Sequence, residues 1–475
     1  MISKLCNQRA AAALSVGLVL ILAAFQAGAQ TTRLDIEQAL TRALIGNEAL
    51  KYARLDYRFE VCRYDLSLRD FLPAISVGYA QDDAVAYFAP DSHLKELSVG
   101  INQLLYAGGA RIYERRNLAA SLRIRDRMID EMEKDLRLEV VNRFVEILKL
   151  GLQIRILEES LAMAWEQVGV AAEEMKLGEI TRLDYIDIEL AVQELEIELS
   201  TLEQEEARLK FELKELLNVS SSNSLELSGQ INPNFRGMLP NREAQYFVEC
   251  ALENSLDLKK HQAEITDLGN RVTQARCSWL PRMSTQVELS VSGARFPLKD
   301  PGFSVGINLD FSAPLAPLRS EVTAGSGGRE ERSLGLSSTV DIGENLMGWQ
   351  TPRIARIELR KAETTMVTAC RALEFSILQQ LEGRSFLLDA LRVADKRLAL
   401  QTQRLSIEAL MLEIGEITRL EYLEGGIDLA RQRIDQLTRI VSLFQMEALL
   451  LARCGLDSLE QSHRNILCTD SEGQL

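Results

Sequence analysis

Histidine, proline and aromatic residues are scarce in this sequence. The three histidines, His93, His261 and His463, stand far apart and lack the spacing of metal ligands. No glycine-rich phosphate loop or nucleophile motif stands out, so the sequence offers no catalytic, cofactor or metal site and argues against an enzyme. With only 10 prolines and 6% aromatic residues, the chain has the composition of long helices.

A net positive charge and closely spaced cysteine pairs are also lacking. The formal net charge is −15 at pH 7, which argues against nucleic acid as a partner. The seven cysteines contain no C-x-x-C pair, which argues against a zinc or redox motif. Most of them fall in helical pattern, where cysteine serves as a small apolar filler.

Long hydrophobic runs are absent beyond the N-terminus. Lys4 and Arg9 precede the apolar stretch 10–25, and Ala27-Gly28-Ala29 follows with small residues. This order predicts a signal peptide cleaved after Ala29, with an N-terminal anchor as the alternative. No other stretch approaches the ~20 apolar residues of a membrane helix. Any passage through a membrane must therefore use strands.

The chain repeats itself. The hexapeptide GEITRL occupies 178–183 and recurs at 415–420, an offset of 237 residues. Phe71-Leu72-Pro73 matches Trp279-Leu280-Pro281 at an offset of 208. Two collinear anchors indicate a duplication. The difference between the offsets gives the second copy 29 extra residues between its anchors.

Each copy has the same predicted order of a helical lead-in, strands, a very long helix, the GEITRL turn and a second long helix. The long helices are expected at 111–176, 184–217, 353–413 and 421–453, and the lead-ins at 35–68 and 242–277. Apolar residues spaced by three and four residues after each turn, mostly leucines in the first copy, predict a coiled-coil seam. The expected division is a signal peptide at 1–29, a first repeat at 30–217, a linker at 218–241, a second repeat at 242–454 with an insertion near 313–345, and a tail at 455–475.

The hexapeptide has a local meaning. Gly178 and Gly415 stand where a helix should end in a left-handed cap residue. Thr181-x-x-Asp184 and Thr418-x-x-Glu421 are capping boxes that begin the next helix. Four further charged residues of the tip are not needed for the turn, and we expect them to make contacts outside the hairpin. They are Arg182, Arg419, Asp187 and Glu424.

Apolar residues alternate with small or polar ones around 75–79, 99–101, 287–291 and 303–311. Such segments fit a barrel with a lipid face and a wet lumen, or an ordinary half-buried sheet. A fifth segment, 334–342, alternates almost as well. Since both tips must lie on one side of a membrane, each copy should cross it an even number of times. We favour 303–311 over 334–342, which predicts four strands per chain and an oligomeric barrel, because four strands cannot close one.

With these features, the chain resembles the TolC-like outer-membrane efflux proteins. The resemblance rests on the duplication, on Leu72-Pro73 and Leu280-Pro281 before the strands, and on QLLYAGG at 103–109. It also rests on the tip pattern of Gly-x-Ile-Thr-x-Leu-acid, with a second acid three residues later. These features cover nearly the whole mature chain.

The resemblance implies a mainly α fold with a β-barrel portion. A homotrimer would form twelve strands in the outer membrane and a helical tunnel across the periplasm. Its tips would dock on a periplasmic adaptor joined to an inner-membrane transporter. The acids that constrict the family's tunnel match Glu421 and Glu424, with Asp184 and Asp187 as first-copy equivalents. Some family members carry a basic gating residue two positions after the tip glycine. That position holds Ile180 or Ile417 here, so this latch does not carry over, and Arg182 or Arg419 is the candidate to replace it.

The alternative is a periplasmic adaptor or a structural coiled-coil protein. An adaptor would typically show one hairpin between β-rich domains, whereas this sequence has two hairpins with strands before each. Release of the protein without detergent would favour the alternative.

Overall fold

The computed structural model describes residues 32–84, 92–220, 224–240, 242–277, 280–311, 317–327, 331–340, 350–456 and 466–468. The expected signal peptide and its cleavage point lie outside these ranges. The chain divides into a unit of residues 1–51, 131–254 and 373–475 and a unit of 52–130 and 255–372. None of the described helices is apolar enough over a sufficient length to span a bilayer.

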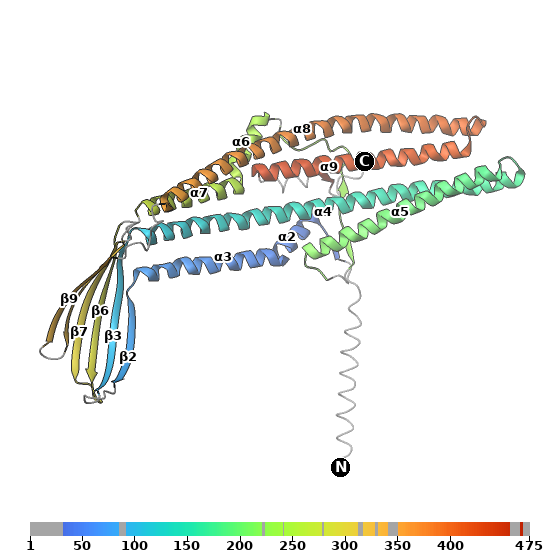
Figure 1. The fold of residues 1–475 in the computed structure, drawn as a ribbon. Coiled ribbons are helices and arrows are strands. Elements are labelled where there is room, and N and C mark those ends of the chain that lie inside the picture. The colour runs from blue at the N-terminus through green and yellow to red at the C-terminus, as the bar shows by residue number, and fades with distance from the viewer. Residues whose placement is uncertain are drawn as a thin grey trace, which may run out of the picture. The chain divides into compact units, whose positions relative to one another are not determined.

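Two long helical hairpins dominate the chain, as expected (Figure 1). The first is α4 (Ala110–Leu177) with α5 (Arg182–Leu216), and the second is α8 (Thr351–Ile414) with α9 (Arg419–Cys454). The predicted bounds differ from these by at most two residues. Leu195, Leu209 and Leu213 on α5 are buried, which confirms the seam after the first turn.

The lead-in of each copy is split into two helices. The first lead-in forms α2 (Ile36–Gly46) and α3 (Glu48–Leu66), and the second forms α6 (Ala244–Asn254) and α7 (Leu256–Arg276). Asn47 and Ser255 stand at the breaks, at the same offset of 208 residues, and each side chain accepts a backbone N–H three residues later. The caps therefore interrupt helices that the sequence pattern alone predicts as continuous.

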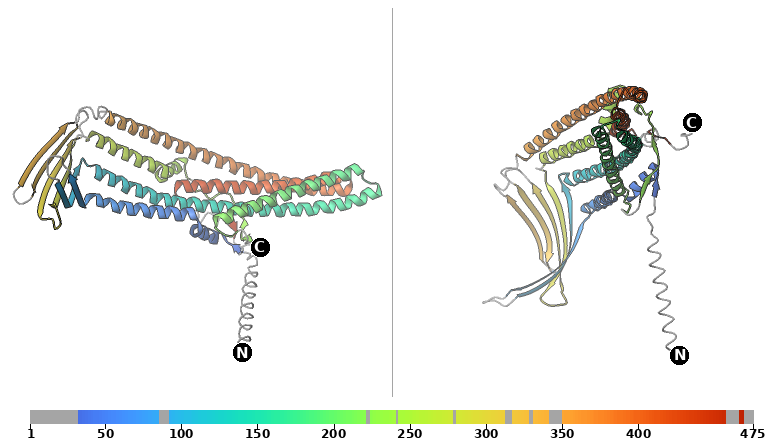
Figure 2. Two further views of the ribbon diagram at one scale, coloured as in Figure 1. Left: turned by 60° about the horizontal axis from the view of Figure 1, so that its bottom comes forward. Right: turned by 90° about the vertical axis from the view of Figure 1, so that its right-hand side faces the viewer.

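The core of the first unit joins both hairpins. Phe144 of α4, Leu213 of α5, Leu391 of α8 and Phe444 of α9 belong to one buried cluster. Figure 2 shows α8 running alongside α9 in both views. Short strands finish this unit: β1 (Thr32–Leu34) pairs parallel with β4 (Leu225–Leu227), and β5 (Gln230–Ile231) pairs antiparallel with β10 (Leu467–Cys468).

A buried carboxylate fixes the connection between the repeats. Glu447 of α9 has no exposed side-chain surface, and it accepts hydrogen bonds from the Arg384 guanidinium and from the Met238 backbone N–H. Gly237 has a φ of +109°, and a Cβ there would lie 2.8 Å from the Glu447 carboxylate. The segment around Gly237 is therefore held against the second hairpin by a charge that is paired on both oxygens.

The second unit contains an antiparallel meander with strands in the order β2-β3-β6-β7-β8-β9. A 3₁₀ turn, η1 (Ser67–Phe71), leads into it. The strands are β2 (Ala74–Ala84), β3 (Ser92–Ala107), β6 (Arg282–Gly293), β7 (Asp300–Phe311), β8 (Leu318–Gly327) and β9 (Glu331–Val340). In Figure 1, β2 forms one edge of the sheet and β9 forms the other.

The expected number of four strands per chain is too low, and the choice of 303–311 over 334–342 was unnecessary. Both segments form strands, β7 and β9, and β8 lies between them. The number of strands in the second copy is thus still even. The alternation of β8 is hard to see in the sequence because serines occupy two of the five positions on its apolar face. In order, this face carries Leu318, Ser320, Val322, Ala324 and Ser326.

Candidate functional site at the hairpin tips

The two GEITRL turns have the same backbone geometry. Gly178 and Gly415 both adopt φ of +80°, a conformation that favours glycine. At the end of each preceding helix, the residue after the glycine donates a backbone hydrogen bond to a carbonyl five residues earlier. The Glu179 N–H donates to the Glu174 carbonyl and the Glu416 N–H donates to the Met411 carbonyl, both at 2.9 Å. This is the Schellman pattern of helix ends, and it confirms the expected left-handed caps.

The capping boxes are confirmed as well. The Asp184 N–H donates to Oγ1 of Thr181 at 3.2 Å, and the Thr181 N–H donates to Asp184 at 3.0 Å. In the second tip the Glu421 N–H donates to Thr418 at 3.2 Å, and the Thr418 N–H donates to Glu421 at 2.8 Å. Hydrogen bonds from Thr181 hold the pKa of Asp184 below its usual range. A cap of this kind is worth about 1 kcal/mol.

The arginines of the two tips differ, although their hexapeptides are identical. Arg419 is largely buried against the first hairpin, where its Nε donates to Oε2 of Glu174 at 2.8 Å and its Nη1 donates to Oε1 of Gln167 at 2.8 Å. Arg182 is exposed, and within the described part of the chain no side-chain bond of it is found. Of the two tip arginines, Arg419 therefore links the hairpins and Arg182 does not.

The position that corresponds to Glu174 differs in the second copy. At the offset of 237 residues, Glu174 of α4 corresponds to Met411 of α8. The second hairpin thus offers no carboxylate at the level where the first hairpin has one. The Arg419 guanidinium beside Glu174 holds the pKa of that carboxyl below its ordinary value. A second, more exposed pair joins Arg431 of α9 to Glu198 of α5 at 3.6 Å.

The acids of the tips remain open to solvent. Asp184, Glu421 and Glu424 are exposed, and Asp187 is half-buried. Beneath them, Val168 of α4, Ile188 of α5 and Leu423 of α9 belong to a buried cluster that joins three helices. The tip region is therefore a packed support that presents negative charge at its surface.

Solved structures with the same architecture are outer-membrane channels. The channel CusC superposes with a TM-score of 0.71 at 14% identity and covers 89% of this chain and 93% of its own. The outer-membrane protein VceC of Vibrio cholerae gives 0.70 at 11% identity over 88% and 96% of the two chains. The CmeC outer-membrane channel of Campylobacter jejuni gives 0.68 at 12% identity over 91% and 89%. The chain has the TolC-like fold.

No family model matches the sequence, and no curated protein matches it either. The TolC-like fold therefore stands on the structure. Its mainly α character with a sheet portion agrees with the expectation from the sequence.

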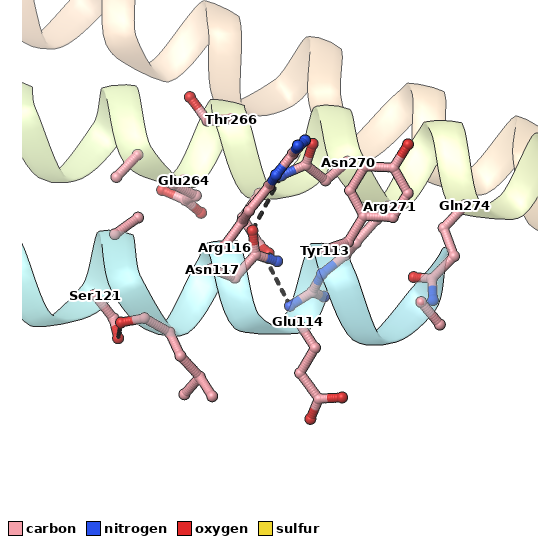
Figure 3. A pocket seen from close by; sticks show the side chains of 15 residues that line it. Tyr113, Glu114, Arg116, Asn117, Ser121, Glu264, Thr266, Asn270, Arg271 and Gln274 are labelled. Atoms are coloured by element: carbon pink, nitrogen blue, oxygen red, sulfur yellow. Dashed lines mark hydrogen bonds and ion pairs between the residues drawn. The ribbon is translucent and has the colours of Figure 1, made fainter. Parts of the chain in front are cut away.

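A cavity of about 600 Å³ lies between α4 and α7 (Figure 3). Asn117 of α4 donates to Asp267 of α7, and Asn270 of α7 donates back to Asn117 at 3.0 Å. Arg271 pairs with Asp267 at 2.9 Å. These bonds satisfy the polar groups that face one another, so we interpret the cluster as a clasp between the two helices. Among the described residues, no three His, Cys, Asp or Glu side chains are grouped to hold a metal.

Sequence reasoning missed Glu174 and Gln167 in this TolC-like tip. They are seven residues apart on α4 and therefore share a face, but nothing in the sequence shows that this face meets α9. The mismatch between Glu174 and Met411 was available as a signal, because the repeat aligns them.

Proposed function

We propose that the chain is a subunit of an outer-membrane exit duct, the outer component of a tripartite efflux pump or type I secretion system. The observation that carries this proposal is the exposed apolar face of the sheet. Ile75, Val77, Leu289, Leu334 and Leu336 are between 57% and 82% exposed. An apolar surface of this extent is costly in water and favourable in lipid, whereas the alternating opposite face is small and polar.

Two helical stripes support an oligomer of identical chains. Leu183, Leu190, Ile197 and Phe211 of α5 are separated by multiples of seven and are 51–68% exposed. On α8, a second stripe repeats every seven residues and is 49–75% exposed; its members are Phe386, Val393, Leu400, Ile407 and Ile414. Exposed heptad stripes of this kind are the contact surfaces of coiled coils.

The two stripes match one another in spacing. The α5 residues lie 5, 12, 19 and 33 positions after Gly178, and the α8 residues lie 1, 8, 15, 22 and 29 positions before Gly415. If the two tips are placed at the same height, side chains of α5 and α8 alternate along the contact at steps of three and four residues. The knobs of antiparallel coiled-coil helices alternate in the same way. Since the surfaces differ, each copy would use its α5 against α8 of the next, and such contacts close into a ring. The resemblance supports three copies in that ring, a homotrimer.

The tips are the proposed contact with the adaptor and the proposed entrance of the duct. Glu421, Glu424, Asp184 and Asp187 would set the charge of that entrance. Gly178, Gly415, Thr181 and Thr418 shape the turn, while Arg182 is free to meet the adaptor and Arg419 holds the hairpins together. No catalytic step, cofactor or metal belongs to this proposal.

Fractionation of the full-length protein tests the proposal. We expect a heat-modifiable trimer that stays with the outer-membrane fraction until detergent is added and that conducts ions in a planar bilayer. Release in soluble form without detergent would instead favour a periplasmic adaptor or a structural coiled-coil protein.

A further inference from the structure

The strands β8 and β9 lie in the stretch that is extra in the second repeat. The second copy has 29 more residues between its anchors than the first. The first copy places two strands between its lead-in and its long helix, and the second copy places four there. The additional residues thus correspond to one added hairpin.

This hairpin continues the sheet in full register. β7 and β8 pair from Gly302 opposite Gly327 to Phe311 opposite Leu318, and β8 and β9 pair from Leu318 opposite Val340 to Gly327 opposite Glu331. Neither ladder contains a bulge. A loop excursion outside the wall would not need this continuous pairing.

The hairpin also continues the apolar face. Across the ladders, Ile307 is level with Val322 and Leu336, and Val305 is level with Ala324 and Leu334. The opposite face of β9 carries only small or polar residues between Arg332 and Val340; they are Ser333, Gly335, Ser337 and Thr339. Both added strands therefore have the lipid and lumen faces of the strands before them.

The apolar band moves along the strands as it crosses the sheet. Residues paired across successive strands define one level of the sheet. The level that starts at Val77 in β2 passes through Val99, Leu289 and Phe303 and reaches Arg332 in β9. In β9 the apolar residues lie beyond that level, toward the end from which α8 begins. A band parallel to a membrane shifts in this way when strands are tilted, and closed barrels require tilted strands. The shift extends without reversal into β8 and β9.

From these observations, and given the proposed duct, we infer that β9 of one copy pairs with β2 of the next. Unpaired sheet edges are not tolerated in lipid, and β2 and β9 are the edges of this sheet. The partner is a second copy of this chain. Each copy then contributes six strands, and a trimer forms a wall of eighteen in place of twelve. Because barrel diameter grows roughly in proportion to strand number, the outer pore would be about 1.5 times as wide.

Disulfide cross-linking in the intact outer membrane tests which strand meets β2. Continuing the band's shift by one more strand places Ser76 of β2 near Ser337 of the neighbour's β9, with both side chains on the lumen face. We would combine Ser76→Cys with Gly335→Cys, Ser337→Cys or Thr339→Cys in turn. The matched control is Ser76→Cys with Asn308→Cys on β7, because β7 would be the edge if the added hairpin lay outside the wall. Single-cysteine variants control for the native thiols.

Links within one chain are excluded by distance. In this sheet β2 is five strand positions from β9 and three from β7, which at about 4.8 Å per step is about 24 Å and about 14 Å. A disulfide needs Cα atoms within about 7 Å. Any cross-linked product therefore joins two copies.

We expect at least one β9 pair to give covalent dimers and trimers, with no product from the β7 control. Products from the control alone would overturn the inference and restore a wall of twelve strands. A membrane-bound oligomer in which none of the three β9 cysteines cross-links to Ser76→Cys would also overturn the inference. A native mass that corresponds to a dimer would overturn the count of eighteen strands. Solubility without detergent would instead reject the proposed duct itself.

Discussion

Arg419 in the second tip donates from Nε to Oε2 of Glu174 in the first hairpin at 2.8 Å, and its twin Arg182 lies exposed. The same residue in the same hexapeptide is thus a tether in one copy and a free surface cation in the other. This gives the chain its own matched control for the role of the tether.

Arg419→Ala should loosen the tips, whereas Arg182→Ala should not. The Arg419 and Glu174 side chains are 18% and 21% exposed, so loss of these charge-assisted bonds should cost about 1–3 kcal/mol locally. In planar bilayers we expect higher or more fluctuating conductance for Arg419→Ala and wild-type conductance for Arg182→Ala. Equal effects of the two variants would mean that the link has no special role at the entrance.

The tether should fail only in strong acid. Arg419 lowers the pKa of Glu174 below its ordinary value of 4.5. The stabilisation is therefore complete above pH 4.5 and is lost as the pH falls through the lowered pKa. Conductance measured against pH should rise in that acid range for the wild type and lose this step in Glu174→Gln. The cap of Asp184 weakens in the same range, but Glu174→Gln leaves it unchanged, so a step that survives in this variant belongs to the cap.

The acids of the second tip should set ion preference. Glu421 and Glu424 are exposed, and Glu421 also caps α9 through one carboxylate oxygen. Glu421→Gln with Glu424→Gln removes the charge and keeps an oxygen that can accept the capping bond. We expect a lower preference for cations and a changed conductance, read from reversal potentials in a salt gradient. Unchanged values would place these acids away from the permeation path.

Glu447 should be a large contributor to stability. Glu447→Ala leaves the Arg384 guanidinium and the Met238 N–H without their partner, and breaking a buried pair in this way costs about 3–5 kcal/mol. Gly237→Ala should also destabilise the protein, because its Cβ would lie 2.8 Å from the carboxylate and φ is +109°. Asp428→Ala, an exposed change on the same helix, should have almost no effect. Denaturant unfolding followed by circular dichroism gives the comparison.

The heptad stripes should control assembly. Leu190→Glu or Leu400→Glu places a charge in the proposed contact between α5 and α8, and we expect monomers in place of trimers on unheated gels. Met163→Glu on α4 is the control, since Met163 is 55% exposed but belongs to neither stripe. Trimers of normal heat stability from both stripe variants would remove this contact.

The parts of the fold that follow from local chemistry were predictable. The long helices, their caps and both turns depend on residues within a few positions of each other, so composition, periodicity and capping boxes located them closely. The even number of strands also followed, from the requirement that both tips lie on one side. The breaks at Asn47 and Ser255 were missed, because each is a single capping residue within a helical pattern.

The sequence by itself determined that this chain is a duplicated pair of long helical hairpins with strands before each, and that its tips are capped turns. Tertiary structure alone decided that β8 and β9 both join the sheet, because serines on the face of β8 hide its alternation and only pairing with β7 reveals the strand. It alone decided that Arg419 is tied and Arg182 free, since identical hexapeptides differ only in the carboxylate that a distant helix brings to them. Local patterns fix which residues form each element, and long-range packing fixes which faces of those elements meet.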